Sequence, residues 1–166
     1  MAAHKPATAF PAPEHDHTAC IADALDAAEQ TCRQDGLRFT PLRRRVLEIV
    51  WNRHAPIGAY DILDEMRDGN RAAAPPTVYR ALDFLVEHGF VHKIESLNAF
   101  IGCGKPDGDH VGQFLICGAC RQVGELDDPE IARLIAKKAK TAGFNVSHQT
   151  IEVMGLCRDC AGNAHA

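Results

Sequence analysis

Four of the seven cysteines form two Cys-x-x-Cys pairs, Cys117 with Cys120 and Cys157 with Cys160. Two such pairs that converge in space supply four thiolates in a tetrahedron, the usual ligand set of a structural zinc ion. The 36 residues between Cys120 and Cys157 exceed the length of a compact zinc ribbon, so the intervening segment must fold back. We therefore predict a closed zinc site, which stabilises the fold and leaves no coordination position for catalysis.

The alternative for the first pair is thiol redox chemistry. A redox Cys-x-x-Cys pair has its thiolate stabilised at a helix N-terminus. Residues 113–116 and 122–126, which flank Cys117 and Cys120, have the apolar pattern of strands, so that stabilisation is missing. The sequence favours zinc, and a thiol oxidoreductase that uses Cys117 and Cys120 stays open as a function of a different class.

A second set of possible metal ligands consists of one cysteine, two histidines and one carboxylate: Cys103, His92, His110 and Glu125. These donors suit tetrahedral zinc, and the thiolate argues against magnesium or manganese. We expect each residue at a strand edge or in a loop around the joint between two domains. A site drawn from two domains closes in one relative orientation only, so metal binding would shift a conformational equilibrium. Spacing alone does not separate this site from a wing histidine, a buried cysteine and surface polar residues.

The first half of the chain has the pattern of a helical domain that ends in a hairpin. We predict four helices. Three are expected at residues 21–34, 41 to about 51, and 75–89, and the third in chain order carries Ile62, Leu63 and Met66 before a break at 70–74. Thr40 and Pro41 are a start signal for the second helix, and residues 57–60 are expected to be a turn into the third. Short strands at 90–95 and 98–102 follow, and this order is that of a winged helix-turn-helix.

The second half has a strand–helix–strand pattern. Strands at residues 113–116 and 122–126 precede a helix at 129–141 capped by Asp127 or Asp128, and a long strand is expected at 145–156. The fold class is therefore α+β, an N-terminal winged helix-turn-helix domain followed by a small α/β dimerisation domain. We expect a disordered tail at 1–18, a DNA-binding domain at 19–102, a hinge and metal-binding loop at 103–112, and the dimerisation domain with the four-cysteine site at 113–166.

Charge and hydropathy limit the classes of partner. The net charge is −4, whereas residues 37–95 hold nine Lys/Arg and eight Asp/Glu, so DNA contact must come from a local patch at Arg38 and Arg43–Arg45. No apolar run approaches the roughly 18 residues of a membrane span. An odd number of cysteines and the absence of a signal-peptide pattern argue against a disulfide framework. We expect a cytoplasmic protein.

The predicted helix at 75–89 is the candidate for DNA recognition. Its first turn and a half offers Thr77, Tyr79 and Arg80, which can donate hydrogen bonds to phosphates and base edges. A helix-turn-helix inserts that end of its second helix into the major groove. Any amphipathic helix has polar residues in its first turn, so these residues alone do not indicate DNA binding. The winged helix-turn-helix order of the predicted elements is what favours it.

These stretches together resemble the ferric-uptake-regulator superfamily, and most closely its zinc uptake regulator branch. The resemblance covers about residues 21–160. It rests on residues 37–43, 59–63, 75–85, 89–96 and 114–120 and on the terminal Cys-x-x-Cys. The run Pro-Pro-Thr-Val-Tyr-Arg-Ala-Leu-Asp-Phe-Leu followed by Gly-Phe-Val-His-Lys is similar to the zinc branch in particular. The His-rich run that iron and peroxide sensors have before the first Cys-x-x-Cys is absent, and only His110 is left.

The resemblance implies a zinc-responsive transcriptional repressor of zinc uptake genes and no enzyme activity. It implies structural zinc at Cys117, Cys120, Cys157 and Cys160, and regulatory zinc at His92, Cys103, His110 and Glu125, hence two Zn²⁺ per monomer. It places Tyr79 and Arg80 on operator DNA, with Arg43 and Thr77 nearby, and assigns Asp64 and Arg67 to salt bridges between neighbouring dimers. The expected partners are an inverted-repeat operator and a second copy of the chain, with one or two dimers per operator and no membrane. An iron- or peroxide-sensing regulator is the alternative within the superfamily.

Overall fold

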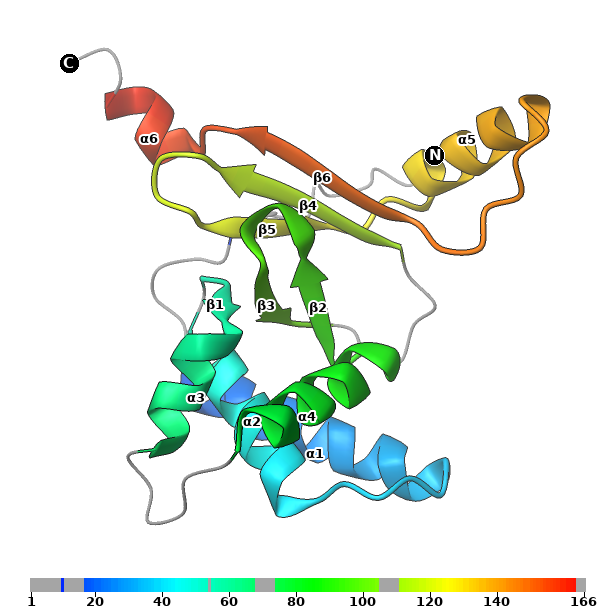
Figure 1. Cartoon of the computed structure of the whole chain (residues 1–166). Helices are drawn as coiled ribbons and strands as arrows, with labels where there is room; N and C mark the ends of the chain where they lie inside the picture. Colours follow the sequence, from blue (N-terminus) through cyan, green and yellow to red (C-terminus); the bar gives the residue numbers. More distant parts are fainter. Residues whose placement is uncertain (1–9, 11–16, 54, 68–73, 105–110, 164–166) are drawn as a thin grey trace. The chain divides into compact units, whose positions relative to one another are not determined.

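The computed structural model describes residues 10, 17–53, 55–67, 74–104 and 111–163. The chain divides into two compact units, whose described parts include residues 17–104 and residues 111–163. Each unit combines helices with one three-stranded sheet (Figure 1). The predicted α+β class is therefore confirmed. None of the helices in the described part of the chain combines the length and the apolar character of a membrane span.

Four helices build most of the first unit: α1 (His17–Gln34), α2 (Pro41–Trp51), α3 (Ala59–Arg67) and α4 (Pro75–Glu87). The Thr40 hydroxyl accepts a hydrogen bond from the Arg43 N–H at 3.3 Å, and Pro41 occupies the first position of α2. Two prolines open α4, and Gly89, with φ +72°, lies just beyond its end. The expected starts and stops of α2 and α4 are confirmed, because cap chemistry is local. Helix α1 starts at His17, earlier than the predicted residue 21 and just inside the segment expected to be disordered.

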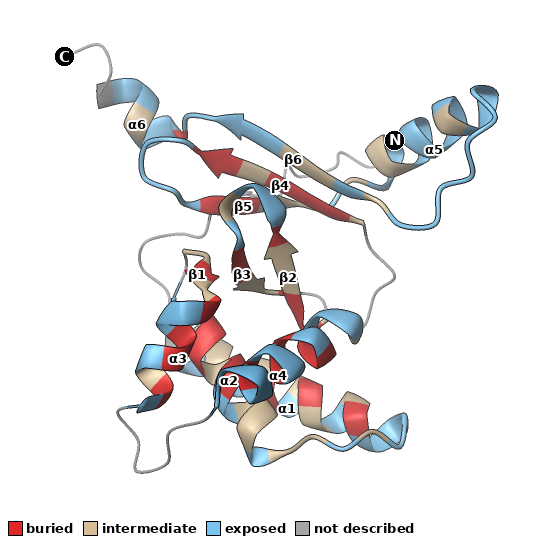
Figure 2. Ribbon diagram, viewed as in Figure 1, coloured by how far each residue is buried: buried red, intermediate tan, exposed pale blue. Residues whose placement is uncertain are grey.

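The core of the first unit lies where the four helices meet (Figure 2). Apolar residues at helical spacing supply it, and the largest fully buried side chains among them are Val46, Leu47, Ile49, Val50, Ile62, Val78, Leu82 and Leu85. Full burial of an aliphatic side chain stabilises a fold by about 1.5–3 kcal/mol. This packing fixes α3 against α4 and leaves the polar residues of the α4 N-terminus on the surface.

A small antiparallel sheet completes the first unit, in the order β1 (Ile57–Gly58), β3 (Ala99–Gly102), β2 (Val91–Ile94). A short 3-10 helix, η1 (Glu95–Leu97), and Asn98, in the left-handed region at φ +46°, connect β2 to β3. The prediction that residues 57–60 are only a turn was wrong, because Ile57 and Gly58 pair with Phe100 and Ala99. Two residues are too few to produce an alternating pattern, so only the partner strand reveals β1.

The second unit is a sheet in the order β5 (Val123–Leu126), β4 (Gly112–Cys117), β6 (Thr150–Gly155), with helices α5 (Pro129–Thr141) and α6 (Arg158–Asn163). Strand β4 is antiparallel to β5 and parallel to β6. The Asp128 carboxylate caps α5 by accepting the Glu130 N–H at 2.8 Å. The predicted strand at 145–156 was too long, since β6 covers only the six residues that pair with the six residues of β4. Helix α6 was not predicted, because six residues give no helical period.

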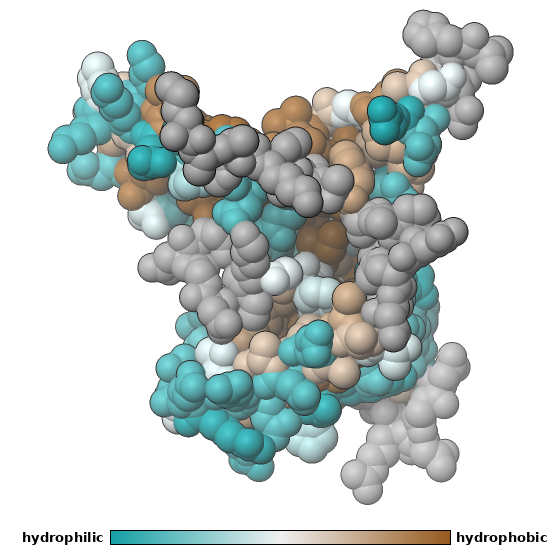
Figure 3. Space-filling view, turned by 180° about the vertical axis from the view of Figure 1, so that it is seen from behind, coloured by the Kyte–Doolittle hydropathy of each residue, from teal (hydrophilic) through white to brown (hydrophobic). Residues whose placement is uncertain are grey.

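Helix α5 and strand β6 expose apolar side chains that a folded monomer would be expected to bury. No residue of α5 is buried, while most of β4 is (Figure 2). The exposed apolar residues of this unit are Leu134, Ile135, Phe144, Val146, Val153, Met154 and Leu156. Hydrophobic side chains accordingly reach the surface of this unit in Figure 3. Several large apolar side chains exposed on one small unit are typical of an interaction surface.

Candidate functional site

The four-cysteine cluster lies at one end of the sheet of the second unit. Cys117 ends β4, Cys120 follows in a turn, and Cys157 and Cys160 lie just after β6 and in α6. Strands β4 and β6 are parallel with Cys117 opposite Gly155, so both Cys-x-x-Cys segments leave the sheet on the same side. The Gly118 N–H donates to the Gly155 carbonyl at 2.8 Å and joins the two segments. The four sulfur atoms lie within 4.8 Å of one another.

Hydrogen bonds shift the pKa values of the cysteines in this cluster in different directions. The backbone N–H groups of Cys120 and Cys157 lower the pKa of Cys117 to about 6, and the Cys157 nitrogen lies 3.4 Å from its sulfur. Hydrogen bonds with the sulfurs of Cys157, Cys117 and Cys120 raise the pKa of Cys160 to about 12. The pKa of Cys120 is also raised, although the Gln122 N–H favours its thiolate, because its thiol hydrogen-bonds to Cys117. Cys117 is thus prepared as a thiolate, whereas Cys120 and Cys160 retain protons that a divalent metal must displace.

The donor set fits zinc. Four sulfur ligands at the spacing of two Cys-x-x-Cys pairs are typical of closed tetrahedral Zn²⁺ sites. Cys117 and Cys157 are buried, Cys160 is half-buried and Cys120 is exposed. A metal here would be held by both chain segments and would tie α6 to the end of β4.

His92 and Cys103 lie together in the sheet of the first unit. His92 is in β2 opposite Ile101, and Cys103 directly follows β3. The Cys103 N–H donates to the Phe90 carbonyl at 3.0 Å, and its side chain is only 2% exposed. Its sulfur lies within 4.8 Å of a ring nitrogen of His92. This adjacency comes from strand pairing, which the spacing of the two residues in the sequence does not reveal.

The other two residues of the predicted regulatory site do not belong to the described part of the first unit. Glu125 belongs to the second unit, where it occupies β5 opposite Phe114 and is half-buried. His110 lies outside the residues that the structure describes. Their assignment to the regulatory site stays a prediction.

The start of α4 presents the side chains predicted to contact DNA. Thr77, Tyr79 and Arg80 are exposed, while Val78 between them is buried in the core. Arg43 is held more closely, because its guanidinium lies 3.5 Å from the centre of the Phe84 ring and also donates to the Arg38 carbonyl. A guanidinium has five N–H donors, so this packing leaves donors for a phosphate.

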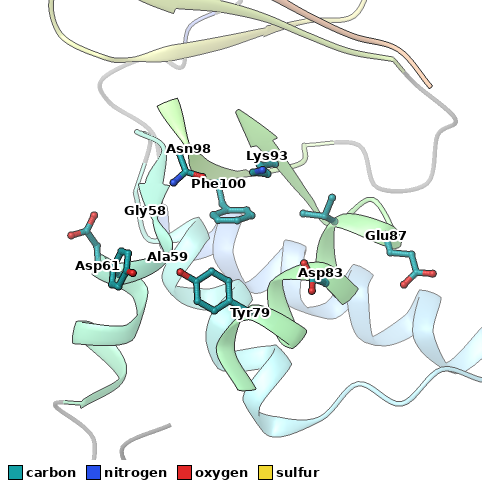
Figure 4. A pocket seen from close by; sticks show the side chains of 11 residues that line it. Gly58, Ala59, Asp61, Tyr79, Asp83, Glu87, Lys93, Asn98 and Phe100 are labelled. Atoms are coloured by element: carbon teal, nitrogen blue, oxygen red, sulfur yellow. The ribbon is translucent and has the colours of Figure 1, made fainter. Parts of the chain in front are cut away.

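A groove of about 610 Å³ lies beside α4, between α3 and the small sheet (Figure 4). Two tyrosines and Phe100 give it aromatic walls, and its charged residues are Asp61, Asp83, Glu87 and Lys93. Three carboxylates against one ammonium disfavour a phosphate chain inside the groove. Thr77 and Arg80, in the first turn and a half of α4, do not line this groove, and their contact with DNA stays a prediction.

The structure adds Tyr60 to the predicted surface residues. It lines the same groove as Tyr79 and is 76% exposed, the largest value among the exposed large hydrophobic residues described. Helical periodicity could have predicted that Tyr60 is exposed. Ile62, Leu63 and Met66 define the buried face of α3, and Tyr60 falls outside that face. Single exposed aromatic residues are ordinary, so the place of Tyr60 in one groove with Tyr79 and Phe100 is what makes it a candidate binding residue.

Asp64 and Arg67, predicted to bridge neighbouring dimers, are one turn apart on α3. They form an ion pair at 2.9 Å within the protomer, and both side chains are more than half exposed. An exposed pair at this spacing contributes at most about 1 kcal/mol. It can therefore exchange partners at little cost.

Zinc binding to the four-cysteine cluster should depend steeply on pH. The raised pKa values of Cys120 and Cys160 mean that binding near neutral pH releases at least two protons, so affinity falls as pH falls. We expect the zinc affinity of this site to drop by roughly 100-fold per pH unit, and more steeply below about pH 6, where Cys117 also takes a proton. Chelator competition between pH 5 and 8 measures this, and an affinity independent of pH would contradict it.

Comparisons with known proteins show the family to which the chain belongs. A sequence model of the Ferric uptake regulator family matches residues 34–154. The chain is 41% identical over 139 residues to the zinc uptake regulation protein of Escherichia coli (strain K12), which covers 83% of this chain and 81% of the relative. It resembles the crystal structure of holo XcZur at 45% identity with a TM-score of 0.79, covering 84% of this chain and 98% of that one. It resembles a zinc uptake regulator complexed with zinc and DNA at 39% identity with a TM-score of 0.83, covering 88% and 98%. The chain therefore belongs to the Ferric uptake regulator family.

Proposed function

We propose that this chain is a zinc-responsive transcriptional repressor that binds operator DNA as a zinc-loaded dimer and represses zinc uptake genes. The observation that carries the proposal is the Cys103 thiol beside the His92 imidazole on the unit that bears α4. A thiolate with an imidazole selects zinc over harder divalent ions. The similarity to zinc uptake regulators, one of them complexed with zinc and DNA, supports the same function.

Each chain takes two zinc ions in this proposal. The first is structural, with Cys117, Cys120, Cys157 and Cys160 as its ligands. The second is regulatory, with His92 and Cys103 from the first unit, Glu125 from the second, and His110. The structural zinc ion would stay bound and stabilise the fold, whereas the regulatory zinc ion would exchange and report the zinc concentration.

Regulation then follows from a site whose ligands come from both units. Zinc binds the arrangement in which all four ligands converge and binds other arrangements less well, so it shifts the population toward that arrangement. The operator selects the same arrangement if it places two copies of α4 at the spacing of an inverted repeat. Zinc and DNA therefore strengthen each other's binding by the same factor.

The DNA contacts come from α4 and the residues around it. Tyr79 and Arg80 reach base edges or phosphates, Thr77 contacts the backbone, and Arg43 adds a phosphate contact beside Phe84. Two dimers can share one operator if Arg67 of one dimer exchanges its Asp64 partner for Asp64 of the other. The exposed Asp64–Arg67 ion pair contributes little to stability, so breaking it for this exchange costs little free energy.

The exposed apolar residues of α5 and β6 support the homodimer. Leu134 and Ile135 on α5 lie with Val153 and Met154 on β6 among the exposed residues of one small unit. A second copy can cover them through a two-fold axis that brings the same surface of each chain together. The same axis relates the two copies of α4.

An iron- or peroxide-sensing regulator is the alternative within the family, and metal titration separates the two. A thiol oxidoreductase is the alternative of a different class. The pKa of Cys117 near 6 favours a reactive thiolate. Its sulfur belongs to a residue that is only 1% exposed, so a disulfide substrate cannot approach it in this fold.

Zinc-dependent operator binding tests the proposal. We expect the wild-type chain to bind about two zinc ions and to bind operator DNA tightly with zinc and weakly with ferrous iron. Cys103→Ser should bind one zinc ion, remain a dimer and lose operator affinity, because only the regulatory site is damaged. Metal analysis, light scattering and fluorescence anisotropy measure the three properties.

The matched control for that experiment is Cys20→Ser, which removes a half-buried thiol outside both ligand clusters of the described residues. It should retain two zinc ions and wild-type affinity for DNA. Tight operator binding with iron and none with zinc would overturn the proposal in favour of an iron sensor.

Arg80→Ala tests the role of α4. Removing an exposed arginine that reads the operator should weaken specific binding by roughly 10- to 100-fold, without changing zinc content or thermal stability. Arg133→Ala, which removes an exposed arginine of α5, should have no such effect. Equal losses in both variants would show that the contribution of Arg80 is bulk charge alone.

Leu134→Glu tests the dimer surface. A carboxylate on the apolar face of α5 must be desolvated at an interface, so the dimer should dissociate at concentrations where the wild type is dimeric. Arg133→Glu places the same group on the polar face of α5 and should leave the dimer intact. Sedimentation velocity distinguishes them, and an unaffected dimer in Leu134→Glu would move the interface away from α5.

A further inference from the structure

The single tryptophan of the chain packs directly on the backbone beside the regulatory cysteine. Trp51 is the last residue of α2, and its indole lies against Gly102, the last residue of β3. A Cβ atom added to Gly102 would lie 2.5 Å from the indole Cε2 and Nε1 atoms and 2.8 Å from Cδ2. Three ring atoms at such distances mean that the indole lies flat over the glycine backbone.

The indole is what restricts residue 102 to glycine. Positive φ angles occur at Gly36, Gly89 and Gly143, and Gly102 is not among these glycines. An alanine could therefore adopt the backbone conformation of residue 102, but its methyl group would collide with a rigid aromatic ring. Trp51 itself cannot withdraw easily, because it also packs against the helical core.

The contact leads directly to two proposed zinc ligands. Gly102 pairs with Val91 within the sheet, and the indole covers the side of Gly102 on which a Cβ would lie. The next residue is Cys103, whose N–H bonds to the Phe90 carbonyl, and the residue after Val91 is His92. The position of the Gly102 backbone therefore determines where the Cys103 sulfur lies relative to the His92 ring.

We propose that Trp51 is a positioning residue for the regulatory zinc site, which it tunes by fixing the end of β3 from which Cys103 projects. This inference rests on the proposed regulatory site at His92 and Cys103. Zinc requires its sulfur and nitrogen ligands at about 2.3 Å and 2.0–2.1 Å, so a small shift of Cys103 weakens binding. Residues that orient metal ligands typically change metal affinity by roughly 10- to 100-fold when replaced.

A double-mutant cycle on Trp51 and Gly102 tests the proposal in the full-length chain. Trp51→Ala should weaken zinc at the regulatory site by roughly 10- to 100-fold, while one structural zinc ion is retained. Gly102→Ala should weaken regulatory zinc in the wild-type background, since the methyl group displaces β3 or the ring. In the Trp51→Ala background the same substitution should have little effect, because the ring it would meet is gone.

The measurements are regulatory zinc affinity by chelator competition, total zinc by metal analysis and stability by thermal denaturation. Leu42→Ala is the matched control, since Leu42 is a partly buried residue packed on the same core from the other end of α2. It should lower stability and leave zinc affinity within twofold of wild type. If Trp51→Ala does not fold, Trp51→Phe, which keeps apolar bulk but covers less of Gly102, replaces it in the cycle.

Two outcomes would overturn the positioning role. One is wild-type zinc affinity in Trp51→Ala or Trp51→Phe, and the other is an equal effect of Gly102→Ala in both backgrounds. Failure of the regulatory site itself has a different signature, because Cys103→Ser would then retain both zinc ions in an otherwise wild-type chain.

Tryptophan fluorescence provides an independent readout. Co²⁺ bound through a cysteine thiolate absorbs near-ultraviolet light, so it should quench the adjacent indole when it occupies the regulatory site. We expect Co²⁺ to quench Trp51 in the wild type, and Cys103→Ser to abolish the quenching. Unquenched fluorescence in a wild-type chain shown by metal analysis to hold Co²⁺ in this site would contradict the proximity of Trp51 to it.

Discussion

The parallel pairing of β4 with β6 is the constraint on which the second unit depends. It sets Cys117 opposite Gly155, and so places both Cys-x-x-Cys segments at one end of the sheet. The unit has few other means of stabilisation: α5 has no buried residue, and the buried apolar residues are confined to the sheet and the cysteines. Units of this size commonly need a metal or a partner to remain folded. A zinc ion at one end of the sheet and a second copy over α5 and β6 would supply both.

The first unit is built on a different principle. Its core is formed by helices whose apolar residues are almost fully inaccessible, and this burial is a source of stability that involves no metal. His92 and Cys103 lie at the margin of this core, on paired strands that the helices support. They are prearranged by an environment whose stability does not depend on them. A ligand pair with that property can lose its metal and keep its geometry, as an exchangeable site requires.

Local chemistry explains which parts of the structure the sequence could predict. The limits of α2 and α4 follow from Thr40, from paired prolines and from Gly89, all of which act within one turn. The four-cysteine cluster was also predictable, because the Cys-x-x-Cys spacing is itself the ligand geometry. Strand β1 and the extent of β6 depend on partners far along the chain, at Phe100 and in β4. The residues alone left the grouping of His92 with Cys103 open, because it arises from strand register and has no motif of its own, and only the family resemblance implied it. The contact of Trp51 with Gly102 was not predicted at all, because a glycine at a strand end has many causes and only the ring above it identifies this one.

The difference in origin between the two clusters bears on how a metal signal could arise. The four cysteines lie at one end of one sheet and in the helix that follows it, so β4 and β6 set their geometry. Zinc there stabilises this unit but does not act on the arrangement of the two units. The proposed regulatory site has half its ligands on the helical unit and at least one, Glu125, on the other. The affinity of such a site is its intrinsic affinity multiplied by the population of the competent arrangement. Ordering His92 and Cys103 in advance raises the intrinsic affinity without changing that population. Trp51 would therefore set the zinc concentration at which the protein responds, while the ligands of the second unit would set how strongly the response is coupled to DNA.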